Sequence, residues 1–173
     1  MTNEINRPQK AWVVAVDMGY GHQRTVYPLK DFAFEGKVIS ANNYEGISNI
    51  DRNVWKLAKD FYESVSDFKK FPLLGNAVFG ILEKLKKILN FYPKRDLSKS
   101  NFTLKVVFAF IKRGWGKNLI SRLSKNRLPF ISAFFTPVFM AEVFNYPGDI
   151  YCVICDADVA RAWVSPKPAQ SKI

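Results

Sequence analysis

The chain opens with an apolar run that ends in a glycine turn. Residues 12–16 (Trp-Val-Val-Ala-Val) are apolar without alternation, which is typical of a parallel strand covered on both faces. Gly19 and Gly21 interrupt this run, and apolar residues at 25–33 then recur at roughly helical spacing. Pro28 would lie in the first turn of that helix, where its missing N–H costs nothing. The pattern predicts a strand at about 11–17, a glycine loop and a helix.

Three amphipathic helical faces follow in the middle of the chain. They cover residues 54–68, 73–92 and 104–119, and Asp51 is a candidate cap before the first of them. Further strands are predicted at about 37–42, 129–135 and 150–156, with a short helix after Pro137.

The alternation of strands and helices predicts an α/β fold, a Rossmann-like parallel sheet flanked by helices. With 48% hydrophobic and 15% aromatic residues, the 173-residue chain can bury one core. We therefore expect one domain at 1–164 with a basic helical insertion at about 51–127. Residues 165–173 are predicted to be a linker or a truncated continuation.

The glycine turn also carries the chain's single histidine, His22. A loop after a parallel strand lies at the carboxyl edge of the sheet, where sites are built, and glycines allow an anion or a sugar hydroxyl to approach the backbone. Arg24 stands where a dinucleotide fingerprint would have its last glycine, and no Walker lysine follows, which excludes NAD and ATP motifs. A plain tight turn and a structural imidazole remain the alternatives.

Positive charge is concentrated in the predicted insertion. The net charge is +11, and residues 52–127 hold 18 Lys and Arg against 5 Asp and Glu. Basic helices rich in Phe, Trp and Leu suit an anionic membrane surface. The residues predicted to face it are Phe79, Lys84, Lys86, Lys87, Lys112, Arg113 and Trp115. The alternative is that these helices only cover the sheet; nucleic acid is a less favoured partner, because no nucleic-acid motif is present.

Cys152 and Cys155 fall within the predicted last strand. We expect both to be buried core thiols in a reducing compartment, because a zinc site would need two further ligands and the chain has one histidine. The polar N-terminal segment lacks a signal peptide and no apolar run has the length of a membrane span. The prediction is a cytoplasmic protein, peripheral on the inner face of the membrane.

Two segments resemble a known family. Gly19-Tyr-Gly21-His22 resembles the first βα turn of GT-B glycosyltransferases that use lipid-linked acceptors, such as the peptidoglycan N-acetylglucosaminyltransferase and the galactolipid synthases. The segment 151–164, an apolar strand followed by Asp156 and then Trp163, resembles the end of the same acceptor-side domain. It departs from the pattern at Arg161 and Ala162, where those relatives tend to place a histidine shortly before the tryptophan.

The resemblance implies half of a GT-B fold that transfers a sugar from a nucleotide-sugar to a lipid-linked or glycan acceptor, with no obligatory metal. His22 would be the general base, or would contact the acceptor or a phosphate. The implied substrate-binding residues are Gly19, Gly21, Gln23, Arg24, Asp156 and Arg161. No cofactor is expected in this chain, and the nucleotide-sugar would bind a second domain or a partner subunit. This chain alone would then not be an active enzyme.

Three alternatives remain open at this point. The chain could be a non-catalytic lipid-binding or scaffolding protein, the acceptor subunit of a split glycosyltransferase, or part of a sugar epimerase on the same double-domain fold. For Asp156, a helix cap is as good an interpretation as ligand binding.

Overall fold

A single parallel sheet organises the protein. The structure, a computed structural model, describes residues 10–67, 102–155, 163–165 and 171–172. Five strands form the sheet in the order β2-β1-β3-β4-β5, and every pair of neighbours is parallel. The strands are β1 (Trp12–Ala15), β2 (Ile39–Ser40), β3 (Phe130–Ser132), β4 (Ile150–Cys152) and β5 (Ser171–Lys172). The predicted α/β class with a parallel sheet is therefore confirmed.

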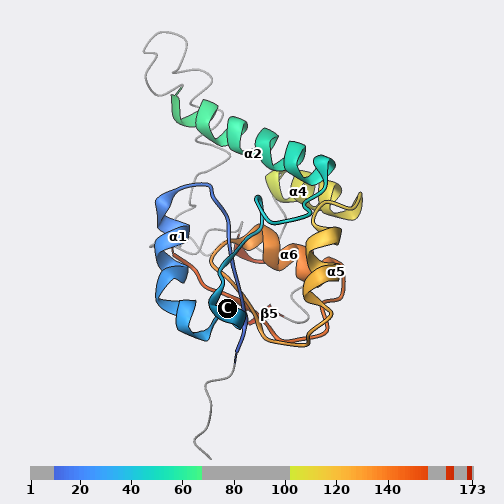
Figure 1. The fold of residues 1–173 in the computed structure, drawn as a ribbon. Helices are drawn as coiled ribbons and strands as arrows, with labels where there is room; N and C mark the ends of the chain where they lie inside the picture. Colours follow the sequence, from blue (N-terminus) through green and yellow to red (C-terminus); the bar gives the residue numbers. More distant parts are fainter. Residues whose placement is uncertain (1–9, 68–101, 156–162, 166–170, 173) are drawn as a thin grey trace, which may run out of the picture.

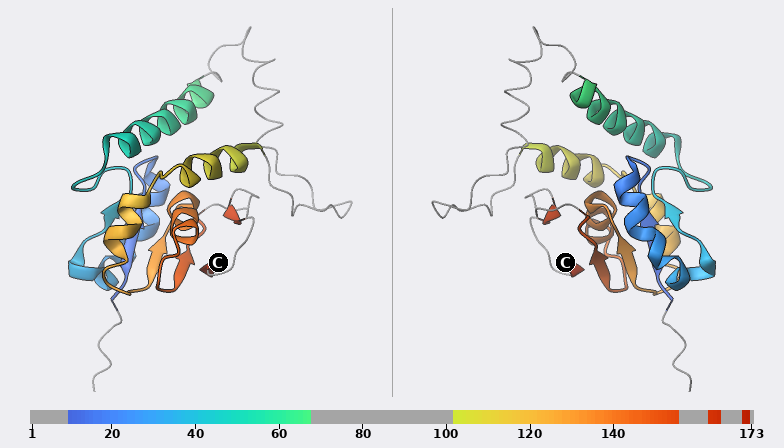
Figure 2. Two further views of the ribbon diagram at one scale, coloured as in Figure 1. Left: turned by 90° about the vertical axis from the view of Figure 1, so that its right-hand side faces the viewer. Right: turned by 90° about the vertical axis from the view of Figure 1, so that its left-hand side faces the viewer.

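Helices lie on both faces of this sheet (Figure 1). They are α1 (Tyr20–Val26), the 3₁₀ segments η1 (Tyr27–Phe32) and η2 (Phe34–Gly36), α2 (Asn49–Asp67), α4 (Phe102–Lys112), α5 (Lys117–Leu123) and α6 (Phe135–Val143). Two further views, each turned by 90° from that of Figure 1, place α2 and α4 beyond the edge of the sheet at which β1 ends (Figure 2).

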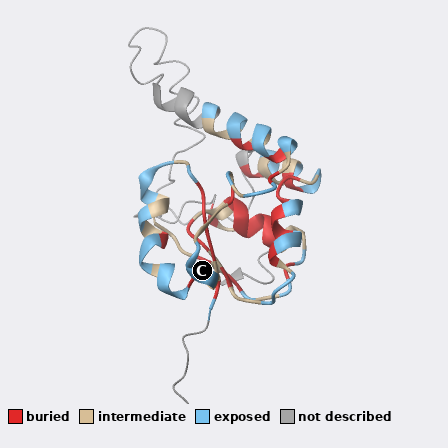
Figure 3. Cartoon of the chain, viewed as in Figure 1, coloured by how far each residue is buried: buried red, intermediate tan, exposed pale blue. Residues whose placement is uncertain are grey.

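The central strand β1 shows why the sheet is covered twice. Side chains alternate across a strand, and here Val13 and Ala15 join one buried cluster with Val26, while Val14 and Val16 join the other. The second cluster is the larger and includes apolar side chains of α4, α5 and α6. The apolar run at 12–16 thus packs on both sides, as its lack of alternation predicts (Figure 3).

The strand order also bears on the expected Rossmann-like topology. The order 2-1-3-4-5 is one of the two common doubly wound arrangements, and the Rossmann order differs from it by a further strand outside β2. No described residue pairs with that outer edge of β2.

Several element boundaries differ from the sequence prediction. The helix starts at Tyr20, so Gly21 lies inside α1, and Pro28 falls in the first turn of η1 and not of α1. Ser171–Lys172, within the predicted linker, pairs with β4 as strand β5.

Asp51 does not cap α2. The helix begins at Asn49, and the Ser48 hydroxyl accepts a hydrogen bond from the Asp51 N–H at 3.0 Å, so Ser48 is the cap. The Asp51 carboxylate is only 3% exposed and accepts the Gly116 N–H at 3.1 Å. This bond ties the start of α2 to the turn before α5.

The single helical face expected at 104–119 is broken into α4 and α5. Gly114 and Gly116 lie between them with φ angles of 110° and 84°, a region that L side chains rarely adopt. A Cβ atom at position 116 would overlap the side chain of Met140 in α6. The break therefore depends on both the backbone angle and the close approach of α6.

Replacing Gly116 by alanine tests this close approach. We expect Gly116→Ala to lower the free energy of unfolding by about 2–4 kcal/mol, because left-handed strain and overpacking add. Gly36→Ala is the matched control, since Gly36 has φ 66° and open space at its Cβ position, so it adds strain alone. Urea unfolding measures both values; equal losses for the two variants would contradict the overlap with Met140.

Tyr146 fastens the segment after α6 to the loop before β3. Its ring is 1% exposed and its hydroxyl donates to the Leu128 carbonyl at 2.6 Å. Burial raises the pKa of Tyr146 to about 12. The neutral phenol is therefore the form that the folded protein favours.

The stability that Tyr146 supplies should disappear in alkali. In the unfolded chain its pKa is about 10, so the unfolded state ionises first and stability falls between pH 10 and pH 12 by about 1.4 kcal/mol per pH unit. Tyr146→Phe should be about 1 kcal/mol less stable than the wild type at pH 8 and lose this disadvantage above pH 10. Urea unfolding at pH 8, 10 and 11 measures the difference, and a constant difference would contradict the assignment.

Candidate functional site

Loops after β1, β3 and β4 meet at the carboxyl edge of the sheet. Since β1 lies between β2 and β3, the strand order reverses direction between β1 and β3, which is where doubly wound sheets bind ligands. The loop after β1 reaches α1 through Gly19, whose φ of 123° and ψ of 153° are accessible in practice only to glycine. This turn places the first residues of α1 at the reversal point.

His22 lies at that point and bonds across it. Its Nδ1 is 2.8 Å from the carbonyl oxygen of Ala133, which is the residue directly after β3. A carbonyl oxygen only accepts, so Nδ1 must carry the proton, and in the neutral ring Nε2 then has the lone pair. The backbone of the loop after β3 thus fixes the tautomer of the His22 side chain on α1.

Cys155 contacts the same imidazole nitrogen. Its Sγ is 3.0 Å from His22 Nδ1 and 4.0 Å from the Ala133 oxygen. The prediction that Cys155 lies in the last strand is wrong, because β4 ends at Cys152 and Cys155 is only partly buried at the sheet edge. Sequence reasoning missed this contact, because residues 153–154 are apolar and extend the strand pattern up to Cys155.

Cys152 behaves as predicted. Its thiol is buried in the larger core cluster, and burial is the main cause that raises its pKa to about 12. A thiol held in its neutral form within the core is unreactive.

Two aromatic rings lie beside His22. Phe134 packs edge-on at 4.7 Å between ring centroids, and Trp163 lies at 6.2 Å. Trp163 is 3% exposed and also contacts Phe135, in keeping with a packing role. The imidazole is thus held by an apolar wall and by one backbone acceptor.

The loop before α1 is fixed by side-chain amides. Asn42, after β2, accepts the Asp17 N–H at 3.0 Å and donates to the Asp17 carbonyl at 3.2 Å. The Gln23 amide donates to the Asp17 carboxylate at 2.7 Å. Gln23, a predicted substrate contact, therefore already has a partner within the loop, and sequence reasoning missed Asn42.

Of the other predicted substrate-binding residues, two lie on α1 and two lie outside the described residues. Gly21 is exposed in α1, and a Cβ placed there would meet nothing within 4 Å, so internal packing does not require glycine at this position. Arg24 is exposed on the same helix. Asp156 and Arg161 lie outside the described residues.

The predicted membrane-facing residues need one correction. Trp115 is 5% exposed and packs edge-on against Trp55 at 4.7 Å, so it belongs to the core and does not face a membrane. Lys112 and Arg113 are exposed at the end of α4. Phe79, Lys84, Lys86 and Lys87 lie outside the described residues.

The arrangement around His22 is suited to proton transfer. An imidazole whose Nδ1–H is held by a carbonyl presents a basic Nε2 in a fixed orientation. Within the described part of the chain, no group of three His, Cys, Asp or Glu side chains could hold a metal ion. None of the described helices combines the length and the apolar character needed to cross a membrane.

Comparisons with protein-family models, with curated proteins and with solved structures found no match to this chain. The site is therefore interpreted from its own geometry.

The tautomer of His22 can be tested directly, because it is the only histidine. We expect the neutral ring to be protonated at Nδ1, since Ala133 offers an acceptor there. Long-range ¹H–¹⁵N correlation spectra of labelled protein distinguish the two nitrogens without interference. Cys155→Ala should keep this tautomer, because the carbonyl alone requires it; an Nε2–H tautomer in the wild type would contradict the assignment.

Proposed function

We propose that this chain is the acceptor-side domain of a membrane-associated glycosyltransferase and that His22 is its general base. The observation that carries the proposal is the contact between His22 Nδ1 and the Ala133 carbonyl, because it leaves Nε2 as a proton acceptor at the sheet edge. The resemblance of the Gly19–His22 turn to lipid-acceptor GT-B enzymes adds the reaction class.

In the proposed reaction an acceptor hydroxyl attacks the anomeric carbon of a nucleotide-linked sugar. The new bond joins the acceptor oxygen to that carbon, the bond to the nucleotide diphosphate breaks, and the hydroxyl proton moves to His22 Nε2. The nucleotide diphosphate leaves with the electron pair. Gly19 and Gly21 would line the cleft that the acceptor enters, and a second domain or a partner subunit would hold the donor.

The placement of α4 and its cations favours a lipid-linked acceptor. α2 and α4 lie beyond the edge of the sheet at which β1 ends, and α1 with His22 begins from that same edge (Figure 2). Lys105 and Lys112 of α4 and Arg113 directly after it are exposed. Cations on this end of the molecule would attract anionic head groups while the acceptor reaches His22.

The experiment uses the protein from its own cells, purified with whatever sequence or subunit accompanies it. Solubilised membranes carrying the tagged chain are supplied with radiolabelled nucleotide-sugars, and transfer is measured as label in the lipid extract. We expect His22→Ala to reduce turnover by about 10²–10⁴-fold, the range for loss of a general base.

Thr25→Ala is the matched control on the same helix, because among the described residues the Thr25 hydroxyl donates to the Gly21 carbonyl within α1 and to no other group. It should keep wild-type turnover. Normal turnover in His22→Ala would remove the base from the mechanism. If wild-type membranes transfer no sugar and the purified chain still sediments with anionic vesicles, the non-catalytic lipid binder replaces the glycosyltransferase as the proposed function.

A further inference from the structure

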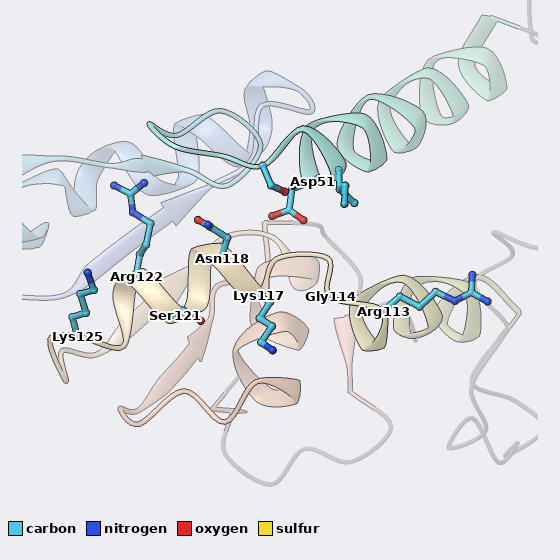
Figure 4. A pocket seen from close by; sticks show the side chains of 10 residues that line it. Asp51, Arg113, Gly114, Lys117, Asn118, Ser121, Arg122 and Lys125 are labelled. Atoms are coloured by element: carbon cyan, nitrogen blue, oxygen red, sulfur yellow. Dashed lines mark hydrogen bonds between the residues drawn. The ribbon is translucent and has the colours of Figure 1, made fainter.

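A second candidate site lies across the sheet from α1. A groove of about 480 Å³ is formed by the start of α2, the turn between α4 and α5, and one side of α5 (Figure 4). The helix α5 packs on the larger core cluster, whereas α1, which carries His22, packs on the smaller cluster on the opposite face. This groove is therefore separate from the site of the proposed transfer reaction and does not depend on it.

The groove is strongly positive. Four cationic side chains line it, and the single carboxylate among its lining residues is Asp51. They are Arg113, Lys117, Arg122 and Lys125, all exposed. The Asp51 carboxylate is buried and already accepts the Gly116 N–H. Among the described residues the one ion pair is Lys37–Glu35, so none of the four cations is neutralised by a described carboxylate.

Arg122 is held in place before any ligand arrives. Its Nη1 donates to the Glu45 carbonyl, and its guanidinium lies 5.6 Å from the centre of the Tyr44 ring. Gly46, with φ 78°, makes room for it, because a Cβ there would come within 2.7 Å of Nη1. A fixed planar fork of donors loses less entropy on binding an oxyanion than a mobile side chain does.

Neutral donors complete the lining. The Asn118 side-chain oxygen accepts a hydrogen bond from the Tyr44 hydroxyl at 3.2 Å. The oxygen of Asn118 is thus engaged, and its NH₂ group can donate to other partners. Ser121, the residue directly before Arg122, adds a hydroxyl group to the lining. Hydroxyl and amide donors beside Arg and Lys are the groups that bind phosphate oxygens.

The cations are spread along the groove and not around one point. Figure 4 shows Arg122 and Lys125 at one end of α5, with Lys117 and Arg113 toward the other. Lys117 is the first residue of α5 and Lys125 lies beyond its last residue, Leu123, so the two flank a helix about 10 Å long. Cations spread along this length suit a ligand with more than one phosphate group better than a single phosphate.

We propose that this groove binds phosphate groups of a multiply phosphorylated ligand, with Arg122 as the fixed anchor and Lys117 and Lys125 as its charged flanks. The same chemistry is present in a soluble diphosphate and in the head groups of an anionic lipid surface. The experiment separates the two sources.

Pyrophosphate is titrated into the full chain and followed by amide chemical shifts of Gly114 and Asn118 at constant ionic strength. Anionic vesicles of phosphatidylglycerol in phosphatidylcholine are tested in parallel by sedimentation. We expect binding of at least one probe, weakened at least tenfold in an Arg122→Gln, Lys125→Gln double variant. Pyrophosphate binding identifies a soluble ligand; vesicle binding alone identifies a lipid head group.

Lys30→Gln is the charge control, because Lys30 is exposed on η1, on the other side of the sheet. Arg122→Lys keeps the charge but removes the fork and should weaken binding more than Lys30→Gln does. Unchanged amide spectra away from the groove show that the variants fold. If neither probe binds, or if the double variant binds both probes as Lys30→Gln does, the groove is only a solvated basic surface.

Discussion

The enclosure of β1 is the constraint on which the rest of this structure depends: the strand pairs with a neighbour at each edge and packs against a core on each face. Val14 lies opposite Ile39 on one side and Ser132 on the other, while its neighbours Val13 and Ala15 pack on the opposite core. A strand enclosed in this way leaves open only its two ends. Polar chemistry is thus forced to the carboxyl end of β1, where Gly19 turns the chain into α1.

At that end the protein orients a side chain with main-chain atoms. The Ala133 oxygen that holds His22 belongs to a loop whose own direction is set by β3. A carbonyl acceptor does not depend on the identity of its residue, so substitutions at 133 that keep the backbone would keep the imidazole orientation. The apolar contacts of Phe134 and Trp163 restrict the ring further without competing for its nitrogens.

The parts of the fold that local sequence determines were predictable, and the parts that distant contacts determine were not. The strand at 12–15, the glycine turn and the position of His22 follow from an uninterrupted apolar run and its end. The end of β4 was not predictable, because Val153 and Ile154 are as suited to a strand as Ile150, and this hid the contact between Cys155 and His22. Likewise, the turn at Gly116 depends on Met140, and the burial of Trp115 depends on Trp55. Both partners are far away in the chain.

The two bonds between Asn42 and the Asp17 peptide have a consequence for how this sequence can change over evolution. One amide accepts from the N–H and donates to the carbonyl of the same residue, so its partner is the backbone and not the Asp17 carboxylate. A carboxylate at position 42 would face the Asp17 carbonyl with oxygen and lose the second bond. Natural variation should therefore be tolerated at position 17, where within the described part of the chain the side chain accepts one bond, from the Gln23 amide. It should be selected against at position 42, because the Asn42 side chain fixes the loop that leads into α1.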